Sequence, residues 1–184
     1  MEFPTNLKDI GNPQLREKLG KLNVADPFFL CDIARTNIES LNYEIPHSLE
    51  CLAAIDRADR KTWDFNCHAY SLGFHERNKF WNARPKKDER LPESAFMQKL
   101  IDKGVLKPRC SKHVQDGDIA IYFSGSKLKH SGVVVGARIR SKWGNLHRWD
   151  HEIADVPIEY GCTTKFYELP EQDVLERFLD CVEP

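Results

Sequence analysis

A cysteine and a histidine stand in the two local settings that activate a thiol. Cys67 follows Asn66 at the start of an expected short helix, and His130 begins an apolar strand. The thiolate is the nucleophilic form of cysteine, and a helix N-terminus and a neighbouring imidazole both lower the thiol pKa, from about 8.5 to about 3.5 to 7.5. Each residue alone is more typical of a structural role, but the two together favour nucleophilic catalysis.

The segment around Cys67 carries the signals of a short helix over residues 67–72. Asn66 is a competent N-cap, and Gly73 can end the helix in the left-handed conformation. The N–H groups of the first turn would then surround the sulfur. The same groups can hold the oxyanion that forms when a thiolate attacks a carbonyl.

Turns and apolar residues predict strands after the cysteine. A turn at Gly117 and Asp118 leads into an apolar strand over residues 119–123, and a turn over 124–126 leads into the strand that His130 begins. The two strands predict an antiparallel hairpin. Further strands are expected over residues 137–142, 146–153 and 163–168, which makes about five in all.

Helices are expected on both sides of this region. They cover residues 13–23, 27–45, 48–55, 94–104 and 170–179. The first four have N-cap signals, at Asn12, Asp26, Ser48 and Ser94. The predicted fold class is α+β, with N-terminal helices and the Cys67 helix packed on an antiparallel sheet of about five strands, and with a closing C-terminal helix.

The composition favours one domain that spans residues 1–184. The chain is 41% hydrophobic and has a net charge of -1, so no overall electrostatic attraction favours nucleic acid or an anionic membrane as a partner. The N-terminus lacks the basic and apolar stretches of a secretory signal, and no segment is long enough to span a membrane. A cytoplasmic location is expected, and leaderless secretion stays open.

The six cysteines do not form a metal-binding or disulfide pattern. They are far apart and contain no C-x-x-C, and reduced buried thiols are expected for the five other than Cys67. A metal site made of Cys67, His68, His75 and His130 would lack regular ligand spacing. We therefore expect no metal and no organic cofactor.

Three segments carry a resemblance to a known family. Residues 66–69 (NCHA), 117–122 (GDIAIY) and 130–136 (HSGVVVG) resemble the NlpC/P60 superfamily of papain-like cysteine hydrolases. A pattern NC...H...SKxG...H is also similar to a related group of bacterial proteins, and the match covers roughly residues 63–168. The cysteine precedes the histidine, unlike the order in the permuted lecithin:retinol acyltransferase-like branch.

The resemblance implies a papain-like core over residues 61–184, in which the cysteine-bearing helix packs on the sheet and the histidine projects from the adjoining strand. Residues 1–60 lie outside it, as a helical N-terminal extension. Three roles stay open for this extension: a cap over the site, a protein-partner surface, or a substrate lid.

A third polar residue normally orients the histidine in such sites. His151 matches the later histidine of the bacterial group and is the preferred candidate, Ser141 is its competitor, and Asp150 is a further alternative. Trp143 is expected to pack beside the site rather than to react.

The leading hypothesis is a thiol hydrolase, of the amidase or peptidase class, that cleaves an amide bond through an acyl-enzyme on Cys67 with His130 as general base and acid. The resemblance implies peptide substrates, especially cell-wall peptides with D-amino acids. An acyltransferase or a deamidase would use the same dyad, and a non-catalytic binding module on a hydrolase-like scaffold is the alternative from another class.

Overall fold

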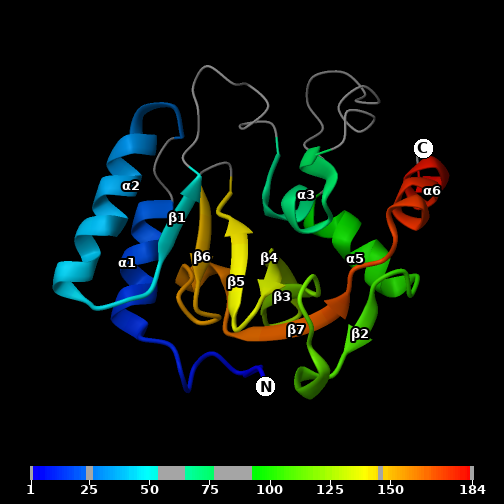
Figure 1. Ribbon diagram of the computed structural model, residues 1–184, viewed down its shortest axis with the longest axis horizontal. Coiled ribbons are helices and arrows are strands. Elements are labelled where there is room, and N and C mark those ends of the chain that lie inside the picture. The colour runs from blue at the N-terminus through cyan, green and yellow to red at the C-terminus, as the bar shows by residue number, and fades with distance from the viewer. Residues whose placement is uncertain (1, 24–26, 54–64, 77–92, 145–146, 183–184) are drawn as a thin grey trace.

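The computed structural model describes residues 2–23, 27–53, 65–76, 93–144 and 147–182, and within these ranges the side chains of residues 23, 27–34, 53, 76 and 179–182 are not described. The fold is α+β, and its seven strands form one antiparallel sheet in the order β1-β6-β5-β4-β3-β7-β2 (Figure 1). The strands are β1 (Glu50–Ala53), β2 (Lys107–Arg109), β3 (Ile119–Ser124), β4 (Lys127–Val135), β5 (Arg138–Lys142), β6 (Arg148–His151) and β7 (Thr163–Glu168).

Helices cover both faces of the sheet. They are α1 (Pro13–Asn23), α2 (Pro27–Glu44), α3 (Cys67–Ser71), α5 (Ser94–Asp102) and α6 (Gln172–Val182), with short 3-10 turns at Phe74–Glu76, Ser111–His113 and Ile158–Tyr160. Figure 1 shows α1 and α2 on one side of the sheet and α3, α5 and α6 on the other. All five of these helices were expected from the sequence, with small differences at their ends.

The strand β3 shows why the sheet needs covers on both faces. Its first five residues are all buried. Ala120 and Tyr122 belong to the core under α1 and α2, whereas Ile119 and Ile121 belong to the core under α3, α5 and α6. A strand buried on both faces reads as a continuous apolar run rather than as an alternating one.

The predicted count of about five strands is wrong, because the sheet has two more. The helix predicted over residues 48–55 is also wrong: Glu50 and Cys51 pair with Asp150 and Trp149 of β6, so edge pairing overrides the local helical pattern. The other additional strand, β2, is short, exposed and contains Pro108, and such a strand has no apolar alternation to reveal it. The five predicted strands are confirmed.

The described residues up to position 53 are built into this sheet. They supply the edge strand β1, and α1 and α2 bury Leu15, Leu19 and Ile38 in the core of the face that they cover. Nearer the N-terminus, Leu7 N donates to Cys162 O at 2.8 Å and Thr164 N donates to Thr5 O at 2.9 Å. These residues therefore stabilise the sheet that carries the candidate site.

None of the helices in the described part of the chain combines the length and the apolarity that crossing a bilayer requires.

Candidate functional site

The thiol of Cys67 lies at the capped start of α3, as predicted. Asn66 Oδ1 accepts hydrogen bonds from His68 N and Ala69 N, both at 3.0 Å, and Gly73 ends the helix with a φ of 73°. Cys67 is only 6% exposed. The sequence signals for this element, from cap to closing glycine, are confirmed.

Helix α3 begins beside the end of the pairing between β4 and β5. Residues 133–135 of β4 pair with residues 138–140 of β5. At Gly132 the two backbones lie so close that a Cβ atom would stand 2.8 Å from Arg140 O and 2.9 Å from Ser141 Cβ. On the other side of Gly132, Ser131 Oγ donates to Cys67 O at 3.3 Å, so the start of α3 lies against this stretch of β4. Gly132, the glycine of the HSG segment, thus permits the close approach of β5 to β4 beside the start of α3.

Burial determines the protonation of Cys67. It raises the pKa of the thiol to about 11, against the opposing effect of the backbone N–H groups of Ser131, His68 and Cys67 itself and of the Lys142 charge. The thiol is therefore protonated at neutral pH in this conformation. The N–H groups around the sulfur favour negative charge there, so they would stabilise a thiolate or an oxyanion that forms beside it.

The imidazole of His130 is fully buried on the strand next to Cys67. His130 pairs with Tyr122 in β3 and its ring stacks on Tyr160, with centroids 3.9 Å apart and planes at 10°. Burial lowers its pKa well below the usual 6.5, so the ring is neutral. Within the described residues neither ring nitrogen has a hydrogen-bond partner, the Cys67 thiol included. The ring thus lies with Tyr122 and Tyr160 on the face of the sheet that α1 and α2 cover. The next residue, Ser131, faces α3, so the structure does not bring the side chains of His130 and Cys67 together.

The two competing third residues are hydrogen-bonded to each other. Ser141 Oγ lies 2.9 Å from His151 Nε2, His151 Nδ1 lies 2.7 Å from Glu152 O, and Trp143 Nε1 donates to Ser141 Oγ at 3.1 Å. A carbonyl only accepts, so Nδ1 of the neutral ring carries the proton and the Ser141 hydroxyl donates to Nε2. Burial lowers the His151 pKa to about 4. Ser141 and His151 thus form one unit beside Trp143.

The aspartates of the two motifs have structural roles instead. Asp150 forms ion pairs with Arg138 and Arg140, and these arginines hold the pKa of its carboxyl below the usual range in spite of burial. Asp118 accepts from Arg109 Nε at 3.1 Å and from Gln115 N at 2.8 Å, which fixes the turn before β3. Asp150, the further alternative for the orienting residue, therefore forms ion pairs with Arg138 and Arg140 rather than a hydrogen bond with His130.

His68 and Ser94, which the sequence suggested only for other roles, complete the surroundings of Cys67. His68 Nδ1 lies 2.8 Å from Ser131 Oγ and Nε2 lies 3.2 Å from Ser94 Oγ, so the ring joins α3, β4 and α5. Burial lowers its pKa to about 4. The predicted capping role of Ser94 is wrong, because the N-cap of α5 is Glu93 and the Ser94 hydroxyl bonds to His68 instead. The only sign of this role in the sequence was the position of His68, directly after the cysteine.

A pocket of about 340 Å³ opens beside the thiol. Its lining includes Cys67, His68, Asn66 and Ser94, with the exposed charges of Glu93 and Lys129. It gives small groups a route from solvent to the start of α3. Among the residues that the structure describes, no group of three histidine, cysteine or acidic side chains is arranged to hold a metal ion.

Comparison with known proteins identifies a family. The model of the family described as Domain of unknown function (DUF7689) matches residues 57–168, which is more than half of the chain, and the protein belongs to this family. The matched range includes α3 and the strands β2 to β7. No curated protein and no solved structure matched the chain.

Proposed function

We propose that this protein is a cysteine hydrolase that cleaves an amide bond through an acyl-enzyme on Cys67, with His130 as general base and acid. The observation that carries the proposal is the capped start of α3, where the backbone N–H groups of Ser131 and His68 face the Cys67 thiol. On the adjoining strand the His130 ring is fully buried and its nitrogens have no partner among the described residues, and it would have to approach the thiol from the other face of the sheet to act as base. A buried polar group without a partner is costly, and an active site is a common reason for one. We also propose that the fold is papain-like, of the NlpC/P60 type.

The resting site holds a neutral thiol and a neutral imidazole, because burial disfavours both charged forms. The proton therefore moves from Cys67 to His130 as the sulfur attacks the carbonyl carbon. The carbon–nitrogen bond then breaks, and His130 returns the proton to the leaving amine. Water, deprotonated by His130, attacks the thioester, which releases the carboxylic acid and restores the thiol.

The backbone N–H groups around the sulfur would bind the oxyanion of the tetrahedral intermediate. Those of Ser131 and His68 already face the thiol and come from two separate elements, β4 and α3. Groups that are fixed before the reaction cost no reorganisation when charge develops. The hydroxyl network of His68, Ser131 and Ser71 keeps these two elements together.

Two features support the orientation of His130. Tyr160 holds the plane of its ring by stacking, and Trp143, which contacts both Tyr160 and the unit of Ser141 and His151, supports Tyr160. The pocket beside Cys67 would admit the substrate. The NlpC/P60 resemblance favours a peptide as that substrate.

Comparison of the wild type with Cys67→Ala tests this proposal. Both proteins would be incubated with peptide libraries and with peptidoglycan fragments, and new amine termini would be identified by mass spectrometry. We expect new termini with the wild type and with Cys110→Ser, which lacks an exposed cysteine, but not with Cys67→Ala. New termini that persist in Cys67→Ala would contradict the proposal. Transfer of the acyl group to an added amine would identify a transferase.

A further inference from the structure

We infer that Lys142 supplies the positive charge of the Cys67 site and stabilises the negative charge that develops on the sulfur. The inference rests on the proposed role of Cys67 as nucleophile. It assigns a positioning residue that the sequence did not reveal, because Lys142 was only one letter of a motif that ends a strand.

Lys142 is placed by the alternation of β5. Its neighbour Ser141 bonds to His151 on the face that α1 and α2 cover, so the side chain of Lys142 projects from the opposite face, toward α3. Lys142 is only 2% exposed. Burying a lysine is costly, and lysine is among the residues least often found fully buried.

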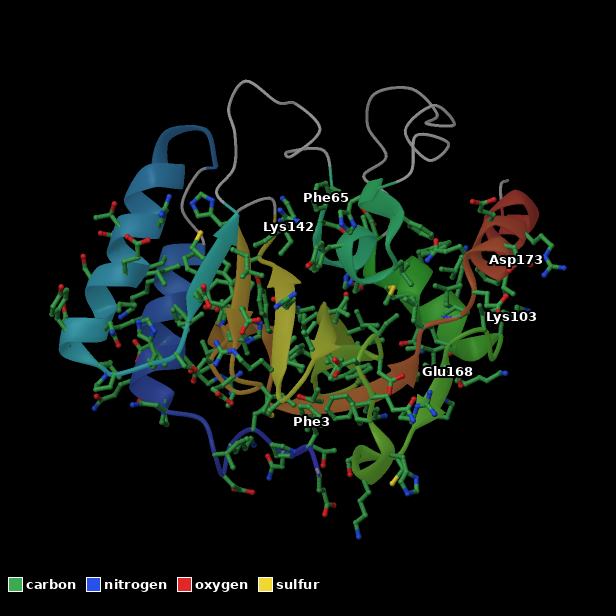
Figure 2. All side chains as sticks on the ribbon, in the orientation of Figure 1. Phe3, Phe65, Lys103, Lys142, Glu168 and Asp173 are labelled. Atoms are coloured by element: carbon green, nitrogen blue, oxygen red, sulfur yellow. The ribbon has the colours of Figure 1, made fainter. Side chains whose placement is uncertain are left out.

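The ring of Phe65 fixes the ammonium group near Cys67. Nζ of Lys142 lies 4.7 Å from the centroid of the Phe65 ring, and Phe65, itself buried, is two residues before the nucleophile. Figure 2 shows the two side chains together, where β5 ends and the chain enters α3. An aromatic ring attracts a cation through its quadrupole, which holds the ammonium group of Lys142 beside the segment that enters α3.

The three buried imidazoles on either side of this part of the sheet do not provide this charge at rest. Burial lowers the pKa of His68 and of His151 to about 4 and that of His130 well below 6.5, so all three rings are neutral at pH 7. The charge of Lys142, in contrast, lowers the pKa of the Cys67 thiol. In a buried site with little water such an interaction is screened far less than at the surface.

The test is the pH dependence of Cys67 alkylation by iodoacetamide, followed on the Cys67 peptide by mass spectrometry. Lys142→Met and Lys142→Gln remove the charge with two different shapes, and Lys142→Arg keeps it. Lys165→Met is the matched control, because Lys165 also lies over a phenylalanine ring, 5.2 Å from the Phe123 centroid, but is exposed on β7.

We expect the neutral variants to react about tenfold more slowly than the wild type at pH 7, with a midpoint raised by about one pH unit. Lys142→Arg and Lys165→Met should keep the wild-type profile. An unchanged profile in a neutral variant, or a folded Lys142→Arg protein that loses reactivity, would overturn the inference. Because the readout is alkylation, hydrolysis that depends on Cys67 without any Lys142 effect would overturn only this inference. A Lys142 effect without hydrolysis would overturn only the proposed function.

Discussion

The imidazole of His130 lies face to face with the phenol ring of Tyr160, with centroids 3.9 Å apart and an angle of 10° between the planes. Tyr160 ends the 3-10 turn Ile158–Tyr160, and its ring also meets Trp143 edge-on, at 6.4 Å. The contact fixes the plane of the imidazole through its face. The nitrogens stand on the ring edge, where neither has a hydrogen-bond partner among the described residues.

Removal of the Tyr160 ring should therefore impair both stability and catalysis. Tyr160→Ala is expected to lower the free energy of unfolding by about 3 kcal/mol, as large-to-small substitutions of buried aromatic residues do. Tyr160→Phe keeps the stacked ring and should cost less than about 1.5 kcal/mol. Urea unfolding and hydrolysis rates of the folded fraction check this. Full activity of folded Tyr160→Ala would show that the stack does not orient His130.

The raised pKa of the Cys67 thiol predicts a loss of stability in alkaline solution. Its folded-state pKa of about 11 lies above the ordinary value of 9.0. Between these values the unfolded chain releases a proton that the native protein keeps, so the free energy of unfolding falls as pH rises. The shift corresponds to roughly 2 to 3 kcal/mol.

The difference in free energy of unfolding between the wild type and Cys67→Ala isolates this contribution, because other groups titrate in both proteins. This difference should be constant up to about pH 8.5, and above that pH the wild type should lose stability relative to Cys67→Ala. Thiolate absorbance that depends on Cys67 should also be absent at pH 7. A difference that stays constant to pH 10.5 would contradict a buried neutral thiol.

The neutral histidines predict the opposite trend in acid. His68 and His151 have folded-state pKa values of about 4, below the ordinary 6.5. As pH falls from 6.5, the unfolded chain binds protons that the native protein excludes, and stability is lost toward pH 4, by roughly 3 kcal/mol for each ring.

Urea unfolding of His68→Gln measures the share of one ring. Between pH 6 and pH 5 its stability should fall less steeply than that of the wild type, by about 1.4 kcal/mol per pH unit, the slope of one proton. His113→Gln removes an exposed histidine and should follow the wild type. Equal slopes in all three proteins would mean that His68 is not held neutral.

Ser141 and His151 should act as one unit. Ser141→Ala leaves His151 Nε2 and Trp143 Nε1 without their shared partner, and His151→Ala frees the Ser141 hydroxyl, so each change should destabilise the protein by about 1 to 3 kcal/mol. The double variant should cost clearly less than the sum, by about 0.5 to 3 kcal/mol. A double-mutant cycle on stability and on hydrolysis measures this. Additive effects would contradict a shared role.

The sequence predicted the local elements of the fold well. Cap and stop signals placed α3 from Asn66 to Gly73, and apolar runs placed the hairpin of β3 and β4, since these depend on residues close in the chain. The edge strands β1 and β2 were missed because their conformation depends on partners about a hundred and about sixty residues away, at Trp149 and Tyr167.

The candidate site was predictable only in part for the same reason. Cys67 and His130 carry local signals, whereas the contact between Ser131 and α3 and the approach of β5 at Gly132 depend on how β4 and β5 pair. The sequence treated Ser141 and His151 as competitors, and only the register of β5 and β6 shows that they are partners. The neighbour of Ser141, Lys142, faces the other side of the sheet through strand alternation.

The most direct test of the central claim is the rate at which p-nitrophenyl acetate acylates Cys67, measured on the Cys67 peptide by mass spectrometry after an acid quench. The wild type and the surface control His113→Ala should form the Cys67 adduct and release it with turnover. His130→Ala should acylate at least about 100-fold more slowly, the usual contribution of a general base. Acylation of Cys67 at the wild-type rate in His130→Ala, or adducts only on other cysteines, would contradict the dyad.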